Sequence, residues 1–103
     1  MAGNEIQVCA STGLLPGSTS ASYNIRFALP NAAHVRISVF DSHAALVKTL
    51  LDADEPATLP GQFRQPPIPW GYTDAQGDPV GSGEYRLYFK SGDFVSTSDV
   101  EVP

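Results

Sequence analysis

The stretch "SYNIRFALPNAAHVRISVFD", residues 22–41, decides the fold, because apolar residues alternate with polar or small ones along both of its halves. The apolar positions are Tyr23, Ile25, Phe27 and Leu29 in the first half and Val35, Ile37 and Val39 in the second. A period of two is typical of a strand that covers a core with one face. Pro30 and the following "NAA" separate the halves as a turn. The stretch therefore predicts two consecutive core strands, with His34, Arg36 and Ser38 facing solvent.

The C-terminal part of the chain repeats this pattern. In "GEYRLYFK", residues 83–90, inward-facing and outward-facing positions alternate. The predicted inward residues are Tyr85, Leu87 and Phe89, and the predicted outward residues are Glu84, Arg86, Tyr88 and Lys90. The next three residues, "SGD" at 91–93, are typical of a hairpin turn. We expect "FVSTSDVEV", residues 94–102, to be the last strand.

The remaining segments predict shorter elements. "EIQVCA", residues 5–10, predicts a first strand, and "STGLLPGSTSAS", residues 11–22, predicts a loop. "DSHAALVKTLLD", residues 41–52, predicts a tight turn and a third core strand. Because Ala, Leu and Lys are good helix formers, a helix over "SHAALVKTLL" is the alternative. We favour the strand because Asp41 ends a clear strand and the next strand pattern begins within a few residues. "ADEPATLPG", residues 53–61, predicts a polar loop.

About seven short strands separated by turn signals predict an all-β fold, an antiparallel sandwich of the immunoglobulin-like or fibronectin III-like kind. A chain of 103 residues and 11.0 kDa suits a single domain, which we expect to span residues 1–103. The composition, 42% hydrophobic and 17% charged, is that of a globular chain rather than a disordered one.

Charge and hydropathy argue against several classes of partner. The net charge of -5 argues against nucleic acid and anionic membrane surfaces, which require clustered Lys and Arg. The basic residues are instead spread singly along the sequence, and they are Arg26, Arg36, Lys48, Arg64, Arg86 and Lys90. No apolar run approaches the ~20 residues that a membrane span requires. The start, "MAGNEIQV", lacks the features of a signal peptide, so either the protein stays inside the cell or the sequence begins after a removed leader.

The stretch "QFRQPPIPW" before Trp70 contains three prolines, which remove three backbone donors. A segment with Pro66, Pro67 and Pro69 is unsuited to the middle of a sheet, so it predicts an edge strand or an unpaired segment. The alternative is a polyproline II ligand for an aromatic groove, since the segment contains Pro-x-x-Pro. We favour an edge that prolines protect against sheet-to-sheet aggregation.

The turn-rich stretch "WGYTDAQGDPV", residues 70–80, has structural and functional interpretations. Asp74 can accept a backbone N–H two residues on, and Gly77 can adopt the positive φ that closes such a turn. A metal site at Asp74 and Asp78 is the weaker alternative, because a calcium loop has alternating carboxylates and ends in a bidentate acid. We expect Trp70 to plug the core, with ligand stacking as the minor alternative.

Catalytic arrangements are not supported. Asp41, Ser42 and His43 are neighbours at one turn, which does not establish the geometry of a catalytic triad. His34 and His43 could meet across adjacent strands, but two histidines without a third ligand make a poor zinc site. The single cysteine, Cys9, falls in an alternating stretch and is expected to be a buried structural thiol. The sequence therefore predicts no enzyme activity, no metal and no cofactor.

Three segments in order resemble the FlgD-type immunoglobulin-like domain, the module of bacterial flagellar hook-capping proteins. They are "SYNIRFALPNAAHVRISVFDSHAALVKTL", Trp70, and "TDAQGDPVGSGEYRLYF". The resemblance covers roughly residues 14–102. It implies a non-catalytic structural or interaction module of a bacterial appendage, sheath or surface assembly, with an extracellular or cell-surface location. Ala44 departs from the family, which usually has Gly in that turn, and so does the proline-rich segment before Trp70.

Candidate contact residues follow from this interpretation. For a protein partner or self-assembly, they are Pro66, Pro67, Pro69, Arg86, Tyr88 and Val100, beside the terminal strands. The alternative function is a carbohydrate-binding module, in which exposed aromatic rings stack on a polysaccharide. Its candidate stacking residues are Phe40, Tyr72 and Tyr88.

Overall fold

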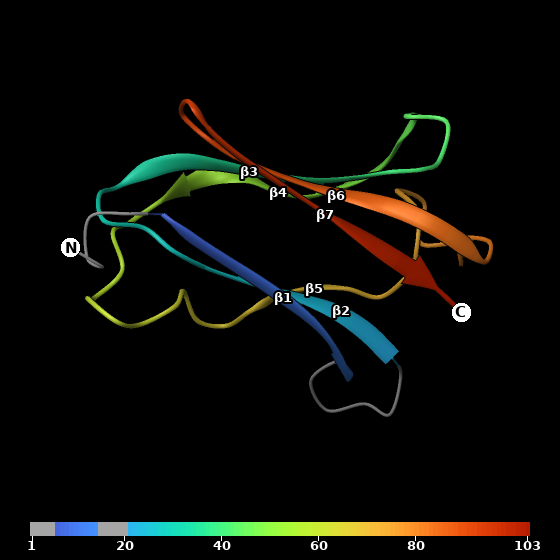
Figure 1. The fold of residues 1–103 in the computed structure, drawn as a ribbon, viewed down its shortest axis with the longest axis horizontal. Helices are drawn as coiled ribbons and strands as arrows, with labels where there is room; N and C mark the ends of the chain where they lie inside the picture. Colours follow the sequence, from blue (N-terminus) through green and yellow to red (C-terminus); the bar gives the residue numbers. More distant parts are fainter. Residues whose placement is uncertain (1–5, 15–20) are drawn as a thin grey trace.

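A computed structural model describes residues 6–14 and 21–103. Over these residues the chain forms seven strands and no helix, in two antiparallel sheets packed face to face (Figure 1). The strands are β1 (Gln7–Leu14), β2 (Ala21–Ala28), β3 (Ala33–Phe40), β4 (Leu46–Glu55), β5 (Ile68–Trp70), β6 (Gly83–Ser91) and β7 (Phe94–Val102). The predicted all-β sandwich is confirmed. Among the described residues, no helix is long and apolar enough to cross a membrane.

The smaller sheet, called sheet A, has the strand order β1-β2-β5, and the larger sheet B has the order β4-β3-β6-β7. Strands β4 and β5, at one edge of each sheet, contact each other across the sandwich. Their opposite edges, β1 and β7, therefore share the other side of the sandwich. We call these the β4/β5 side and the β1/β7 side.

The core lies between the two sheets and contains the residues that alternation predicts. Its buried hydrophobic residues are Ile25, Phe27, Leu29, Val35, Ile37, Val39, Ile68, Trp70, Leu87, Phe89, Val100 and Val102. Phe27 of β2 and Phe89 of β6 meet in the middle, with ring centroids 5.3 Å apart. The predicted core strands over residues 22–41 and 83–90 are confirmed, with Tyr23 and Tyr85 only half-buried at the ends.

One residue expected to face solvent is buried. Ser38 points to the outer side of sheet B, yet it is only 2% exposed. It lies on a central strand, with Thr49 of β4 and Tyr88 of β6 as its cross-strand partners. These larger neighbours stand on the same face and cover the small serine side chain.

Several predicted boundaries were wrong. Strand β1 ends at Leu14, so residues 11–14 belong to a strand rather than to the predicted loop, of which residues 15–20 lie outside the described part. Strand β4 continues to Glu55, because Ala33 at the start of β3 pairs with it. Pairing with a neighbouring strand here overrides the polar composition of the segments. The alternative helix over 42–51 is also wrong, since β4 begins at residue 46.

The prediction for Cys9 was wrong as well, because its side chain is exposed. Val8 and Ala10 pack against the core, so the pleat sends Cys9 outward. There it stands opposite Arg26 of β2, which is also exposed. The alternation was identified correctly, but its inward phase was assigned to the wrong residues.

Truncating either central phenylalanine should destabilise the domain strongly. We expect Phe27→Ala and Phe89→Ala each to lower the free energy of unfolding by about 3–5 kcal/mol, because each leaves a cavity between the sheets. Chemical denaturation followed by tryptophan fluorescence measures this loss. Thr97→Ala, on the exposed outer face of β7, is the control and should change stability by less than about 0.5 kcal/mol. A near wild-type unfolding midpoint for either phenylalanine variant would contradict the packing.

Candidate interaction site

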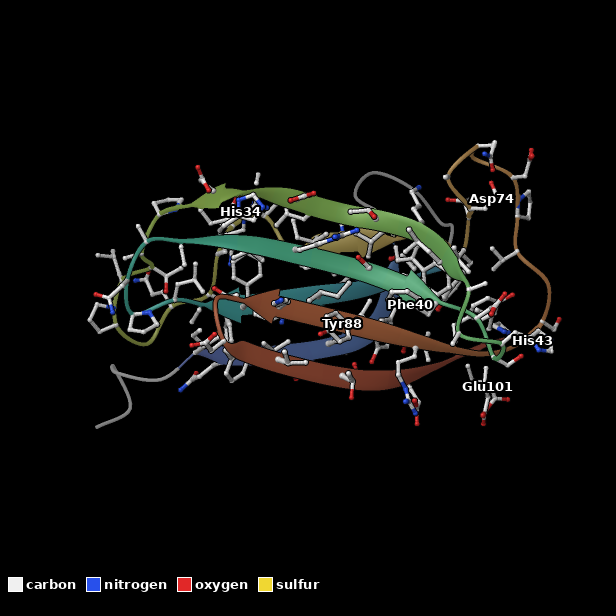
Figure 2. All side chains as sticks on the ribbon, turned by 90° about the horizontal axis from the view of Figure 1, so that it is seen from above. His34, Phe40, His43, Asp74, Tyr88 and Glu101 are labelled. Carbon is white, nitrogen blue, oxygen red and sulfur yellow. The ribbon has the colours of Figure 1, made fainter. Side chains whose placement is uncertain are left out.

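The outer face of sheet B, formed by the outward residues of β3, β6 and β7, carries three of the eight candidate contact residues, Phe40, Arg86 and Tyr88. Its members are His34, Arg36, Ser38, Phe40, Glu84, Arg86, Tyr88, Lys90, Val95, Thr97, Asp99 and Glu101. Figure 2 looks onto this face, with His34 near one end and His43 and Glu101 near the other. Phe40 and Tyr88 lie between these ends.

One end of the outer face carries a pair of basic residues. Arg36 of β3 stands directly opposite Lys90 of β6, although 54 positions separate them in the sequence. Within the described part of the chain, neither residue forms an ion pair. Like charges directly opposite each other destabilise a sheet. The basic residues are spread singly along the sequence, but the strand register brings these two together.

The other end of the outer face is acidic. Glu84 of β6 stands opposite Glu101 of β7, a second like-charge pair, and both are exposed. Next to them, Arg86 Nε lies 3.2 Å from Asp99 Oδ1, with both side chains more than half exposed. An exposed pair of this kind contributes little to stability.

A pocket of about 340 Å³ opens at this acidic end. Its lining residues are Phe40, Asp41, Ser42, Ala44, Glu84, Tyr85, Arg86 and Asp99. Three of them carry carboxylates and one carries a guanidinium, so the lining has an excess of negative charge. A cationic group on an apolar stem fits this combination, because the pocket also has the rings of Phe40 and Tyr85 in its wall.

The three candidate stacking aromatics do not form one platform. Phe40 and Tyr88 are neighbours with ring centroids 6.2 Å apart, but their planes are inclined at 81°, so the two rings do not present one flat surface. Tyr72 lies apart from them and packs edge-on against Trp70, with ring centroids 5.3 Å apart. The structure therefore separates Tyr72 from the other two residues.

Trp70 is confirmed as the core plug. Its side chain is fully buried and its Nε1–H donates a hydrogen bond to the backbone oxygen of Thr73, at 2.9 Å. Tyr85 packs against its ring, with centroids 5.5 Å apart, and the Tyr85 hydroxyl donates to the Gly81 carbonyl at 2.7 Å. Satisfying the indole N–H inside the fold is what allows so large an amphipathic side chain to be buried.

Asp74 heads the turn that its sequence predicts. Its Oδ1 accepts the backbone N–H groups of Gln76 and Asp78, both at 3.0 Å, and its carbonyl accepts the N–H of Gly77. Gly77 has a φ of 87°. The carboxylate thus organises the loop. Among the described residues, no group of three or more His, Cys, Asp or Glu side chains could hold a metal ion.

A second turn with the same hydrogen-bond pattern joins β3 to β4. Asp41 Oδ1 accepts the N–H groups of His43 and Ala45, at 2.8 and 3.0 Å, and its carbonyl accepts the N–H of Ala44. These backbone hydrogen bonds, from Ala45 first and then His43, lower the pKa of Asp41 from its ordinary value. Ala44 occupies the place of Gly77 and has a φ of 62°, so this turn keeps the left-handed residue without a glycine. Asp41 serves the turn, and this arrangement gives no support for a catalytic triad.

The two histidines do not meet, contrary to what the sequence suggested. His34 lies at the start of β3 and His43 follows its other end (Figure 2). His34 instead sits between two carboxylates of β4, with Nε2 2.5 Å from Asp52 and Nδ1 2.8 Å from Asp54. These two hydrogen bonds, the one to Asp52 first, raise the pKa of His34 above its ordinary value of 6.5.

The proline candidates lie at the β4/β5 side. Pro66 and Pro69 are exposed and Pro67 is half-buried, and β5 pairs with β2 as a short edge strand, as predicted. The segment is fastened by Arg64, whose Nε donates to Glu55 and whose Nη1 donates to the Pro66 carbonyl, both at 2.8 Å. This attachment favours the edge interpretation over a free polyproline ligand.

The prediction that Val100 contacts a partner is wrong for its side chain. It belongs to the core and is only 2% exposed. Its neighbours Asp99 and Glu101 are the residues of β7 that face solvent here. Arg86 is exposed and Tyr88 is half-buried on the outer face of sheet B, where a partner could contact both.

A scan against protein-family models finds no matching family, and a search of curated proteins finds no match.

Exchanging the residue types between the two turns should have opposite effects. We expect Ala44→Gly to stabilise the domain, by up to about 1 kcal/mol, because glycine removes the cost of a left-handed alanine. Gly77→Ala should destabilise it by about 1 kcal/mol, since a Cβ there meets open space and only the backbone conformation opposes it. Thermal unfolding of both variants measures the effects. Stability changes of the same sign in the two variants would contradict the conclusion that Ala44 and Gly77 hold the same left-handed position.

The carboxylates beside His34 should govern its titration. We expect the pKa of His34, followed by NMR, to lie above 6.5 and to fall towards it in the Asp52→Asn, Asp54→Asn double variant. The pKa of His34 is raised in the folded state. Protonated His34 therefore adds its full contribution to the free energy of unfolding below the unfolded-state pKa, and this contribution is lost as the pH rises through the folded-state pKa. A titration midpoint of His34 in the double variant equal to that in the wild type would show that the two carboxylates do not affect this imidazole.

Proposed function

We propose that this domain is a non-catalytic interaction module, a subunit or accessory domain of a larger assembly, that joins its partner by strand addition on the β1/β7 side. The observation that carries the proposal is the contrast between the two sides of the sandwich. One side has several features that prevent strand addition, and the other side offers long, regular edges.

The β4/β5 side is protected. Strand β5 has three residues, one of them Pro69, and two further prolines precede it. Strand β4 is irregular against β3 at two positions and carries charged side chains, which include Lys48, Asp52 and Asp54. Prolines, bulges and charges are the usual means by which edge strands avoid pairing with other chains.

The β1/β7 side has little of this protection. Strand β1 pairs with β2 along eight consecutive residues, and it contains neither proline nor a charged residue. Strand β7 pairs with β6 along nine residues without a bulge, and its only charges are Asp99 and Glu101. Long edges with a continuous register are templates for pairing with another chain.

The register identifies the free amides of β7. Two residues, 92 and 93, join β6 to β7, and Gly92 has a φ of 58°. In a hairpin with a two-residue loop, the flanking residues Ser91 and Phe94 form two backbone hydrogen bonds with each other. Bonded and non-bonded pairs alternate along an antiparallel ladder. The amides that point away from β6 are therefore those of Val95, Thr97, Asp99 and Glu101.

The resemblance to the hook-capping module supports an appendage, sheath or surface assembly at the bacterial cell surface as the setting. The turn that contains Asp41, Ser42 and His43 is explained by its backbone hydrogen bonds, which supports a non-catalytic role. A carbohydrate-binding function is less well supported, because the rings of Phe40 and Tyr88 are nearly perpendicular.

Amide hydrogen exchange at increasing protein concentration tests strand addition. We expect the four outward amides of β7 to exchange rapidly in the monomer, while those of Ser96, Ser98 and Val100 are protected by β6. On association, the outward amides should become protected. Rapid exchange of these amides in a sample whose mass has risen would contradict joining through β7.

A proline substitution gives an independent test. Thr97→Pro removes an outward N–H, so it should weaken association while the fold is retained. Thr97→Ala is the matched control, because it shortens the side chain and keeps the N–H. Equal association of the two variants, measured by sedimentation, would exclude the backbone of β7 as the joining element.

A further inference from the structure

We propose that the outer face of sheet B binds the same face of a second copy of this chain, with Arg36 and Lys90 of each copy over the acidic pocket of the other. This surface is distinct from the β1/β7 side, and the proposal does not depend on strand addition. It rests on the opposite charges of Lys90 and Glu84 at the two ends of β6, because at the basic end Arg36 also has Asp52 of β4 as its other cross-strand neighbour.

The basic pair and the acidic pocket lie at opposite ends of the same strands. Lys90 and Glu84 are both on β6, six residues apart, which corresponds to about 20 Å along a strand. Arg36 lies near one end of β3, and Asp41 follows the other end. A two-fold axis that runs across the strands, between the facing sheets, reverses the strand direction and brings unlike ends together.

The axis can be placed on the strand register. Val39, Leu87 and Ser98 form one row across β3, β6 and β7, midway between the two ends. With the axis over this row, Lys90 of one copy lies over Glu84 of the other.

Three further positions are also complementary in this arrangement. Tyr88 then faces Arg86 of the second copy, a pairing of a ring with a guanidinium. Thr97 faces Asp99, so a hydroxyl donor meets a carboxylate acceptor. Arg36 falls over the part of the pocket formed by Asp41 and Ser42.

The isolated domain shows why such a contact is favourable. Each copy holds two like-charge cross-strand pairs, Arg36 with Lys90 and Glu84 with Glu101, and a like-charge pair opposes the stability of a sheet. Arg36 is partly compensated by Asp52, its cross-strand neighbour on β4. When the acidic pair of one copy docks against the basic pair of the other, the repulsion within both pairs is offset. The half-buried rings of Phe40 and Tyr88 add apolar area between the charged ends.

The size of the face indicates a weak dimer. The three strands that form the face, of eight or nine residues each, offer roughly 15 × 30 Å, which is in the range of weak, transient protein interfaces. Because charge contributes much of the complementarity, the affinity should fall as the ionic strength rises.

Charge reversal tests the proposal in the whole chain. Sedimentation equilibrium, from about 10 µM to about 1 mM protein and at about 50 mM salt, measures the dimer Kd. We expect Lys90→Glu and Glu84→Lys each to raise the Kd about tenfold or more, because each places like charges across the two-fold axis. The Lys90→Glu, Glu84→Lys double variant should recover the wild-type Kd. Arg26→Glu, on the exposed face of sheet A, is the control and should leave it unchanged.

Two further measurements distinguish loss of this contact from loss of folding, and the face-to-face dimer from strand addition. The melting temperature of each single variant should stay at or above that of the wild type, since each reversal also relieves a like-charge pair within the chain. Amide exchange at Val95 and Thr97 should stay rapid in the face-to-face dimer, whereas strand addition through β7 would slow it.

A wild-type chain that stays monomeric at about 1 mM and low salt would overturn the proposal. A double variant no better than the two single variants would also overturn it. The second outcome leaves strand addition untouched, because its readout is the exchange of the β7 amides. A chain that stays monomeric would show self-association by neither surface.

Discussion

The apolar contact between the two sheets is the interaction on which the rest of the structure depends. Phe27 and Phe89 meet at 5.3 Å between their ring centroids, and both are fully buried. The strands pair only within their own sheets, so burial of such side chains holds the two layers together. Because successive side chains in a strand alternate, turning Phe89 inward sends Tyr88 and Lys90 outward. The outer face of sheet B is therefore a consequence of how the core packs.

Much of the fold could be predicted from local patterns. Alternation located the two consecutive strands and the C-terminal hairpin, and the proline-rich segment was placed at an edge. The failures arise where pairing with a distant strand decides the outcome. Strand β4 extends to Glu55 because Ala33 pairs with it, and Cys9 is exposed because Val8 and Ala10 face the core. Short polar or small residues at the edge of a sheet have no strong preference for strand or loop, or for the inner or outer face. Pairing with their neighbours therefore decides both.

The candidate site was less predictable, because it depends on register. Arg86 and Tyr88 could be placed on an outer face by alternation alone. The pairing of Arg36 with Lys90 could not, since it joins strands far apart in the sequence. The turn at Asp74 was predictable from its aspartate and glycine. Its counterpart at Asp41 lacked the glycine signal, although the same hydrogen bonds form there.

The position of β1 and β7 on one side of the sandwich has a mechanical consequence. These strands belong to different sheets, so a partner that extends only one of them leaves the other sheet ending at the joint. Such a joint bends easily towards the unsupported layer. A partner that is itself two-layered can continue both sheets, and the joint then resists bending in both directions because load passes through the full thickness. Whether a single strand or a second sandwich is added therefore decides if the assembly behaves as a hinged chain or as a stiff rod.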